Sequence, residues 1–164
     1  MRDHQDLTRT DMKKIIFMGR SGSGKTTLIK ALRGESLQYH KTQYIDYHDE
    51  LMDTPGEYTE GNDLGGALAV YTYESDVAAL VLSATDDFCV FPPACAPVAN
   101  RPVVGVVTKC DDADARPETA AMRLELCGCE RIFFTSAKTG QGIDEIRRYL
   151  REPVEKSRKW GSSD

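Results

Sequence analysis

The sequence predicts a three-layer α/β fold in which a six-stranded, mostly parallel sheet carries helices on both faces. Two observations predict it: short apolar runs alternate with helical patterns along the chain, and the run at residues 77–83 is almost continuously apolar, as in strands buried on both faces. The chain has 164 residues, which is enough for one domain and too few for two. We expect a domain over residues 12–153, a flexible N-terminal extension over 1–11 and a flexible C-terminal tail over 154–164.

The first half of the chain predicts three strands and one helix. One apolar run is short, and two further strand-like runs flank a polar turn at His48-Asp49. Three apolar residues recur at helical spacing within 27–33, and Gly34 is placed to end that helix. The Gly-rich stretch at 61–66 has the composition of a mobile loop. The strands expected in this half are residues 15–18, 43–46 and 50–52.

The second half predicts three more strands and two helices. Pro117 suits the first turn of one helix, and Gly128 suits its end. In a final helix over 143–151, acidic residues occupy the first turn and arginines lie toward the end, in the order that suits the helix dipole. We expect these arginines to form a solvated face. The strands expected in this half are residues 77–83, 103–108 and 131–134.

Charge and hydropathy exclude two classes of protein. The chain carries 21 Lys and Arg against 26 Asp and Glu, a net charge of −5, so it is not a basic protein built to neutralise nucleic-acid phosphates. No apolar run approaches the ~20 residues of a membrane-spanning helix, and the first residues lack the apolar core of a signal peptide. We therefore expect a cytoplasmic protein that neither binds nucleic acid nor inserts into a membrane; its oligomeric state is not predicted.

The five cysteines are odd in number and show no paired zinc spacing. In a reducing compartment we expect them to be small apolar fillers of the core. The alternative for Cys127-Gly-Cys129 is a redox-active or metal-binding pair.

The strongest motif is Gly19-Arg-Ser-Gly-Ser-Gly-Lys-Thr26, which fits G-x-x-x-x-G-K-[ST] between a predicted strand and a predicted helix. Glycines let the backbone curl so that its N–H groups point at phosphate oxygens, and the following helix presents its positive end to the same anion. Lys25 is expected to contact the β- and γ-phosphates and to act in catalysis, while the Thr26 hydroxyl ligates Mg²⁺. The phosphate-binding candidates here are Gly19, Arg20, Ser21, Gly22, Ser23, Gly24, Lys25, Thr26 and Thr27.

A second motif, Asp53-Thr-Pro-Gly56, follows a predicted strand. Asp53 is expected to help hold Mg²⁺, and the Gly56 N–H to meet the γ-phosphate. Alone the pattern also fits an ordinary turn, but its place downstream of the phosphate loop favours the functional interpretation.

The segment Thr108-Lys-Cys-Asp111 closes a buried strand and bears on the choice of base. Asp111 can accept hydrogen bonds from N1–H and the 2-amino group of guanine, a donor pair that adenine lacks. The Lys109 stem can lie along the base, and the segment 136–138 can offer a main-chain N–H to guanine O6. The predicted ligand is therefore GTP or GDP with Mg²⁺. The base-binding candidates are Thr108, Lys109, Asp111, Ser136, Ala137 and Lys138.

Over residues 13–152 these motifs resemble the small Ras-like GTPase domains of the P-loop NTPases, which implies a six-stranded sheet with one antiparallel edge hairpin. Lys41-Thr42-Gln43 and Asp53-Thr-Pro-Gly-Glu-Tyr58 more closely resemble the EutP/PduV family. That resemblance implies a bacterial microcompartment for ethanolamine or propanediol breakdown. It also makes Thr42 the candidate switch threonine that joins the Mg²⁺ shell.

The sequence departs from the wider GTPase pattern at two positions. Glu57 stands where many small GTPases have the glutamine that orients water, so we expect slow hydrolysis, with Glu57 as a second catalytic candidate. Thr108 stands where asparagine is commoner, which predicts a weaker tie to the phosphate loop. The cations Arg20 and Lys41 are expected to face solvent.

These features predict a guanine-nucleotide-dependent switch, a slow Mg²⁺-dependent GTPase that docks on a microcompartment shell or enzyme partner. Two alternatives remain. One is a phosphotransferase that moves the γ-phosphate to a small metabolite such as acetate. The other is a structural adaptor of the microcompartment that binds nucleotide without turnover.

Overall fold

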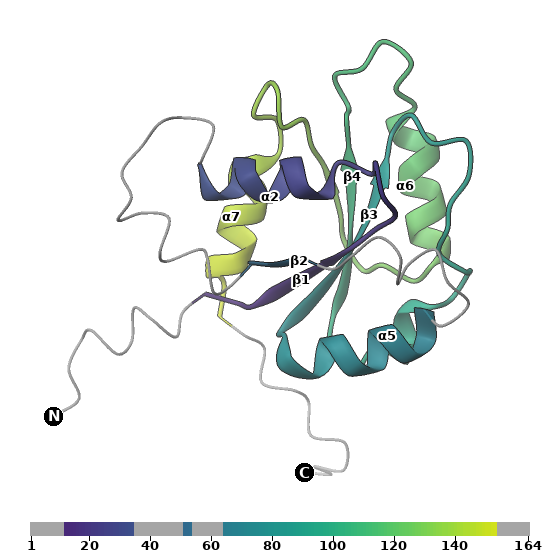
Figure 1. The fold of residues 1–164 in the computed structure, drawn as a ribbon, viewed down its shortest axis with the longest axis vertical. Helices are drawn as coiled ribbons and strands as arrows, with labels where there is room; N and C mark the ends of the chain where they lie inside the picture. Colours follow the sequence, from purple (N-terminus) through teal and green to yellow (C-terminus); the bar gives the residue numbers. More distant parts are fainter. Residues whose placement is uncertain (1–11, 35–50, 54–63, 154–164) are drawn as a thin grey trace, which may run out of the picture.

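The computed structural model describes residues 12–34, 51–53 and 64–153. Within them, five strands form one sheet in the order β2-β1-β3-β4-β5, and every neighbouring pair is parallel (Figure 1). The strands are β1 (Ile15–Met18), β2 (Leu51–Asp53), β3 (Val77–Ser83), β4 (Val103–Thr108) and β5 (Ile132–Phe134). The helices are α2 (Lys25–Arg33), α5 (Leu64–Tyr71), α6 (Pro117–Leu126) and α7 (Ile143–Arg151), with short 3₁₀ turns η2 (Thr72–Glu74) and η3 (Ala96–Val98).

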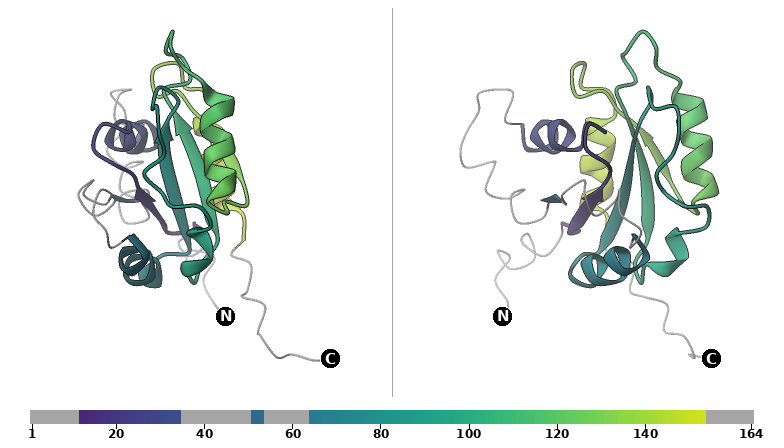
Figure 2. Two further views of the ribbon diagram at one scale, coloured as in Figure 1. Left: turned by 90° about the vertical axis from the view of Figure 1, so that its right-hand side faces the viewer. Right: turned by 45° about the vertical axis from the view of Figure 1, so that its right-hand side comes forward.

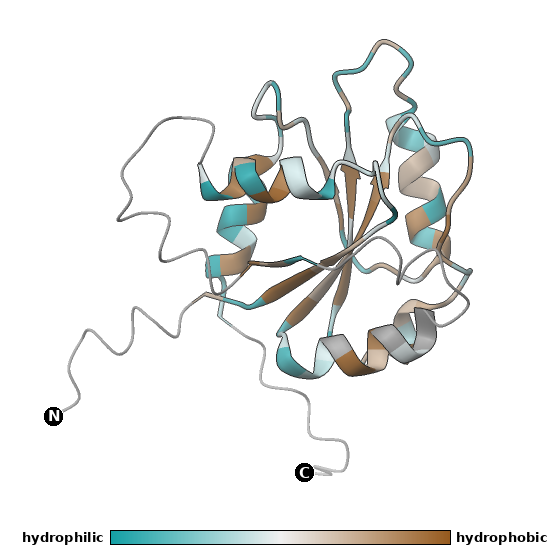
Figure 3. Ribbon diagram, viewed as in Figure 1, coloured by the Kyte–Doolittle hydropathy of each residue, from teal (hydrophilic) through white to brown (hydrophobic). Residues whose placement is uncertain are grey.

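The sheet separates two layers of helices, as Figure 2 shows. Side chains of α2 and α7 pack on one face, together with Ile15 and Phe17 of β1. Side chains of α5 and α6 pack on the other face, together with Ile16 and Met18 of the same strand. Successive residues of a strand point to opposite faces, so a strand covered on both sides must be apolar throughout. Figure 3 accordingly shows strands that are mostly hydrophobic, whereas α2, α6 and α7 mix hydrophobic and hydrophilic residues. The predicted three-layer α/β class is confirmed.

Several elements have the bounds that the sequence predicts. These are the strands at residues 15–18, 77–83 and 103–108 and the helix at 143–151. Gly34 ends α2 in a left-handed conformation, as expected. Strand β2 is shifted by one residue to include Asp53, and α6 ends at Leu126. The sixth predicted strand, at 43–46, lies outside the described residues, so the described sheet has five strands.

Helix α5 was not predicted from the sequence. The interpretation of 61–66 as a mobile loop is wrong at its C-terminal end, because Leu64 begins a helix that includes Gly65 and Gly66. Glycine disfavours helix by about 1 kcal/mol per residue, but Leu68 of this helix is fully buried in the core. Burial of the apolar side chain outweighs the local preference.

The arginines of α7 do not form a purely solvated face. The Arg147 guanidinium is partly buried and donates hydrogen bonds to the carbonyls of Ala31 (3.0 Å) and Leu32 (3.1 and 3.2 Å) in the last turn of α2. The last carbonyls of a helix lack partners inside it. Arg147 therefore caps α2 and joins the two helices of one layer.

The order of the strands indicates that a ligand would bind at the carboxyl edge of the sheet. The chain passes from β1 to β2 on one side and returns to β3 on the other, so the connections that leave β1 and β3 diverge. In such sheets ligands bind outside the carboxyl ends of the strands at this switch point. No helix within the described ranges is long and apolar enough to cross a membrane.

Shortening a leucine side chain should lower the free energy of unfolding on the buried face of α6 and not on its exposed face. Leu124 is fully buried whereas Leu126 is 64% exposed. Leu124→Ala should destabilise the protein by about 2–5 kcal/mol, because it removes buried methyl groups and leaves a cavity. Leu126→Ala should stay within about 0.5 kcal/mol of the parent. Urea unfolding measures both, and equal losses would contradict the assigned faces.

Candidate functional site

The sequence motifs lie at the carboxyl edge of the sheet, each directly after a strand. The candidate phosphate loop follows β1, Asp53 ends β2, the segment from Thr108 follows β4, and the segment from Thr135 follows β5. Because all five strands are parallel, these ends meet along one edge. The fold thus brings together motifs that are far apart in the sequence.

The candidate phosphate loop has a backbone shape that requires glycine at two points. A Cβ atom on Gly19 would lie 2.8 Å from the Ser23 Oγ and 2.9 Å from the Val81 carbonyl oxygen, so no larger residue fits. Gly24 has a φ of 89° and precedes α2, a conformation that costs other residues free energy. The turn is closed by the Ser23 N–H, which donates to the Arg20 carbonyl at 3.1 Å. The result is a tight loop that leads into the N-terminus of α2.

Oxygen ligands for a hard cation converge beside this loop. Lys25, whose side chain is 8% exposed, forms an ion pair with Asp53. The Thr26 hydroxyl lies 3.5 Å from the other Asp53 carboxylate oxygen. No group of three or more His, Cys, Asp or Glu in the described parts of the chain could hold a metal ion. A hydroxyl and one carboxylate nevertheless fit Mg²⁺, which commonly takes one or two protein ligands and completes its shell with substrate phosphates and water.

Two hydrogen bonds join the candidate base-binding segment at the end of β4 to the candidate phosphate loop. The buried Thr108 hydroxyl donates to the Ser23 carbonyl, and the Lys109 ammonium donates to the Gly22 carbonyl at 2.8 Å. Lys109 holds a φ of 59°, which is unusual for a residue with a side chain. Sequence reasoning predicted a tie weaker than the one that asparagine would make. The structure shows that the Thr108 hydroxyl makes one contact and that Lys109 adds a second.

Asp111 is positioned by the loop after β5. The buried Ser136 hydroxyl donates to Asp111 at 2.8 Å and accepts from the Thr139 N–H at 3.2 Å. Asp111 itself is exposed, as is Lys138, whereas Ala137 is partly buried. The predicted base-binding residues Asp111 and Ser136 are therefore neighbours in space. The Ser136 hydroxyl that holds Asp111 is itself fixed by the Thr139 N–H.

Arg20 does not face solvent as predicted. Its guanidinium forms an ion pair with Asp86, whose side chain is 5% exposed, and its Cζ lies 5.5 Å from the centre of the Phe88 ring. Asp86 follows β3 at the same edge of the sheet as Arg20. An aspartate placed just after β3 is the signal that sequence reasoning missed. The ion pair joins Arg20 to the loop that follows β3.

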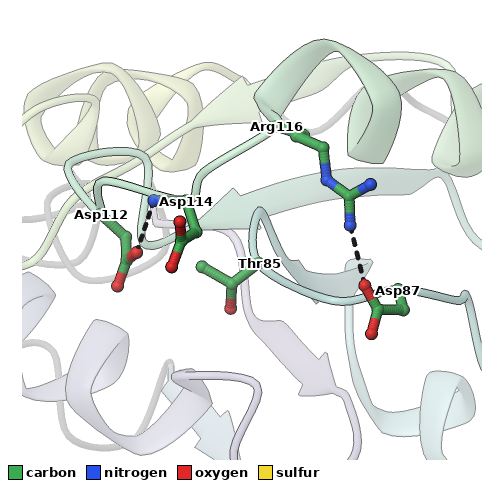
Figure 4. A pocket seen from close by; sticks show the side chains of 5 residues that line it. All are labelled: Thr85, Asp87, Asp112, Asp114 and Arg116. Carbon is green, nitrogen blue, oxygen red and sulfur yellow. Dashed lines mark hydrogen bonds and ion pairs between the residues drawn. The ribbon is translucent and has the colours of Figure 1, made fainter.

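An open polar pocket lies between the loops that follow β3 and β4 (Figure 4). Arg116 crosses it to bond Asp87 at 2.9 Å, and Asp112 accepts from the Asp114 N–H at 2.9 Å. Thr85 completes the lining. Three carboxylates and a single guanidinium, which is already paired with Asp87, line the pocket, so it is poorly suited to an anion.

The remaining candidates divide into placed and unplaced residues. Ser21 and Gly22 are exposed at the tip of the phosphate loop, and Thr27 is exposed in the first turn of α2. The other candidates, Thr42, Gly56 and Glu57, lie outside the described residues, as does Lys41.

Comparison with known proteins shows the family. Residues 12–152 match the PduV-EutP family, described as ethanolamine utilisation - propanediol utilisation. The chain is 42% identical to the propanediol utilization protein PduV of Citrobacter freundii over 140 residues, which cover 85% of this chain and 93% of that protein. It is 35% identical to the probable acetate kinase EutP of Salmonella typhimurium over 144 residues, 85% and 89% of the two chains. The chain therefore belongs to the PduV-EutP family.

A solved structure is similar in fold. The G-domain of FeoB from Methanococcus jannaschii superposes with a TM-score of 0.55 at 16% identity, covering 84% of this chain and 94% of that one. The two proteins therefore share an α/β fold.

Removing the Thr108 hydroxyl should loosen the junction between the two loops. Thr108→Val keeps the shape but leaves the buried Ser23 carbonyl without this donor, which should cost about 1–3 kcal/mol of stability. Thr108→Ser retains the hydroxyl and should lose less. Urea unfolding of both variants measures the difference, and identical midpoints would show that the hydrogen bond contributes nothing.

Proposed function

We propose that this chain binds GTP and GDP with Mg²⁺ at the carboxyl edge of its sheet and hydrolyses GTP slowly as a molecular switch. The observation that carries the proposal is the junction of the two loops, in which Thr108 and Lys109 bond the carbonyls of Ser23 and Gly22. A phosphate loop alone fits any nucleoside triphosphate. Joined to a segment that ends in an aspartate, it fits one with a guanine base.

The phosphate end would be held by the loop at 19–24 and the first turn of α2. Backbone N–H groups of the loop and the helix N-terminus attract phosphate oxygens, and Lys25 neutralises the β- and γ-phosphates. Thr26 and Asp53 would hold Mg²⁺, which supplies charge neutralisation at the phosphates when bound. Lys25 must then exchange its ion pair with Asp53 for a phosphate contact, leaving that carboxylate to the metal.

The base end would be read by Asp111. Its carboxylate can accept from the guanine N1–H and 2-amino groups, and the Ser136 hydroxyl fixes one of its oxygens. Main-chain N–H groups near Ala137 and Lys138 would meet guanine O6. The Lys109 stem would lie along the base, and adenine would leave the carboxylate without its donors.

Turnover would be slow for the isolated chain. Thr42 and Gly56 are proposed to sense the γ-phosphate, and Glu57 stands where a neutral amide would orient water better than a carboxylate beside a phosphate anion. Arg20 is held by Asp86. Without a supplied arginine, a small GTPase turns over at about 10⁻⁴ to 10⁻³ s⁻¹. In-line attack of water would then depend on charge stabilisation by Lys25 and the metal.

The setting proposed for this switch is a bacterial microcompartment in the cytoplasm. Membership of an ethanolamine and propanediol utilisation family supports it. The nucleotide state would control docking to a shell or enzyme partner, while an adaptor that never hydrolyses nucleotide would dock regardless of it.

A phosphotransferase is the second candidate, because a relative at 35% identity is named a probable acetate kinase. The reaction would pass the γ-phosphate of the nucleotide to acetate and release the nucleoside diphosphate and acetyl phosphate. The open pocket of Figure 4 does not favour it, since Asp87, Asp112 and Asp114 would repel a carboxylate substrate.

Asp111→Asn should shift base preference from guanine to xanthine. The amide presents a donor to the 2-oxo group of xanthine, where the carboxylate requires the 2-amino group of guanine. We expect at least a tenfold loss of GDP affinity, equivalent to about 1.4 kcal/mol, and a gain for xanthosine diphosphate. Fluorescence titration with both nucleotides measures it, with Asp112→Asn as the neighbouring control. Unchanged guanine preference would mean that another residue reads the base.

Phosphate release distinguishes the three activities. With GTP and Mg²⁺ the purified chain should release phosphate at about 10⁻⁴ to 10⁻³ s⁻¹, at the same rate with or without acetate. Formation of acetyl phosphate, detected as its hydroxamate, would contradict the switch and support the acetate kinase. Tight GDP binding without release would instead favour the adaptor.

A further inference from the structure

Four of the five cysteines lie outside the candidate nucleotide motifs and gather on one face of the sheet. Cys95, Cys127 and Cys129 are buried members of the core beneath α6, and Cys89 packs against it while partly exposed. They come from two segments: the long connection after β3 and the turn after α6. These four residues are called the thiol cluster below.

Backbone contacts fix the two segments against each other. The Ala96 N–H donates to the Cys127 carbonyl at 2.9 Å, and the Ala94 N–H donates to the Leu126 carbonyl at 2.9 Å. Ala94 holds a φ of 58°, so the chain accepts an unfavourable conformation where it turns toward α6. The proximity of the cysteines is therefore built into the fold.

Cys127 lies at the centre of the thiol cluster. Its Sγ lies 3.7 Å from the Phe91 carbonyl oxygen and 3.2 Å from the Arg123 carbonyl oxygen. Phe91 lies between Cys89 and Cys95 in the sequence, so the Cys127 thiol packs against the segment that carries both of these cysteines. Of the two, only Cys89 is partly exposed, so it is the one that a dissolved reagent meets first.

The environment of Cys89 favours its thiolate. The hydrogen bond from Cys127, together with the Phe91 N–H and the charge of Arg123, lowers the pKa of Cys89 to about 7 against the opposing effects of burial and Asp86. Burial raises the pKa of Cys129 to about 12 and also raises that of Cys110. A partly exposed thiolate beside a second thiol is the arrangement of oxidation-sensitive cysteine pairs.

We propose that Cys89 and Cys127 form a modification site at which hydrogen peroxide converts the two thiols into a disulfide. The Cys89 thiolate attacks one peroxide oxygen, the O–O bond breaks, and the departing hydroxide takes a proton from solvent to leave as water. Sulfur is oxidised to the sulfenic acid and peroxide is reduced. The Cys127 sulfur then attacks the Cys89 sulfur, the S–O bond breaks, and the hydroxyl leaves as water with the Cys127 proton.

The site lies on the segment that also holds the phosphate loop. Asp86 pairs with Arg20, and the Arg123 guanidinium donates to the carbonyls of Asp86 (2.9 Å) and Asp87 (2.7 Å) just before Cys89. The proposed oxidation needs no nucleotide, so its test is independent of the proposed GTP binding.

Peptide mapping of the full chain after peroxide treatment tests the proposal. Wild-type protein should lose two of its five free thiols and yield a tryptic peptide 42–109 linked to peptide 124–131, because trypsin does not cleave the Arg101-Pro102 bond. Trypsin leaves Cys89 and Cys95 on one peptide and Cys127 and Cys129 on the other. Fragmentation at Pro92 separates the first two and fragmentation at Gly128 the second two, and the link should join Cys89 to Cys127. Absence of the linked peptide, or a link from Cys95, would overturn the proposal.

Single substitutions assign the two roles. Cys89→Ser should abolish the disulfide, whereas Cys95→Ser and the distant control Cys110→Ser should keep it. In Cys127→Ser the reaction should stop at a sulfenic acid on Cys89 that dimedone labels. A disulfide that survives in Cys89→Ser would contradict the assignment. If Cys127→Ser does not fold, the wild-type map and the Cys89→Ser variant still decide it.

Discussion

The candidate site depends on one junction, where side chains that follow β4 bond two consecutive carbonyls of the phosphate loop. Thr108 donates to the carbonyl of Ser23, and Lys109 to that of Gly22. Gly24 comes next, and a Cβ there would lie 3.2 Å from the Thr108 hydroxyl. The loop that would hold phosphates and the segment that would read the base are thus one packed unit. Neither could move without breaking the buried hydrogen bond of Thr108.

The parallel sheet brings the two loops of this junction close together. Parallel strands bring their carboxyl ends to one edge, and strands β1, β3 and β4 are apolar on both faces because helices cover both sides. The loops therefore rest on a rigid core, with charge concentrated at their ends. Two ion pairs, Lys25 with Asp53 and Arg20 with Asp86, connect the phosphate loop to the ends of β2 and β3.

Sequence alone predicted the parts of the fold that follow from local pattern. Continuous apolar runs gave the bounds of β3 and β4, and amphipathic spacing with ordered charges gave α7. It did not predict α5, because Gly65 and Gly66 read as a loop and only the tertiary burial of Leu68 makes a helix favourable. The candidate site was recognisable because each motif carries its own chemistry. The roles of Arg20 and Arg147 were misread, because ion pairs and caps between distant segments leave no local pattern.

The cysteines show the same limit. Their sequence spacing indicated only core fillers and one close pair, whereas the fold packs Cys89 and Cys127 from separate segments beneath α6. Cys89 thus lies on the same connection as Asp86, which pairs with Arg20 of the candidate phosphate loop. The two proposed chemistries, nucleotide binding and thiol oxidation, would be carried by neighbouring segments.

Calorimetric titration of nucleotide-free protein with GTP and Mg²⁺ tests the central claim most directly, with Lys25→Ala as the matched variant. The wild-type chain should release heat that saturates at one nucleotide per chain, and should do so with GDP as well. The folded variant should bind GTP at least a hundredfold more weakly, equivalent to about 2.7 kcal/mol. A wild-type chain that gives no heat with either nucleotide, or a variant that binds GTP equally well, would contradict the assignment of residues 19–26 as a phosphate-binding loop.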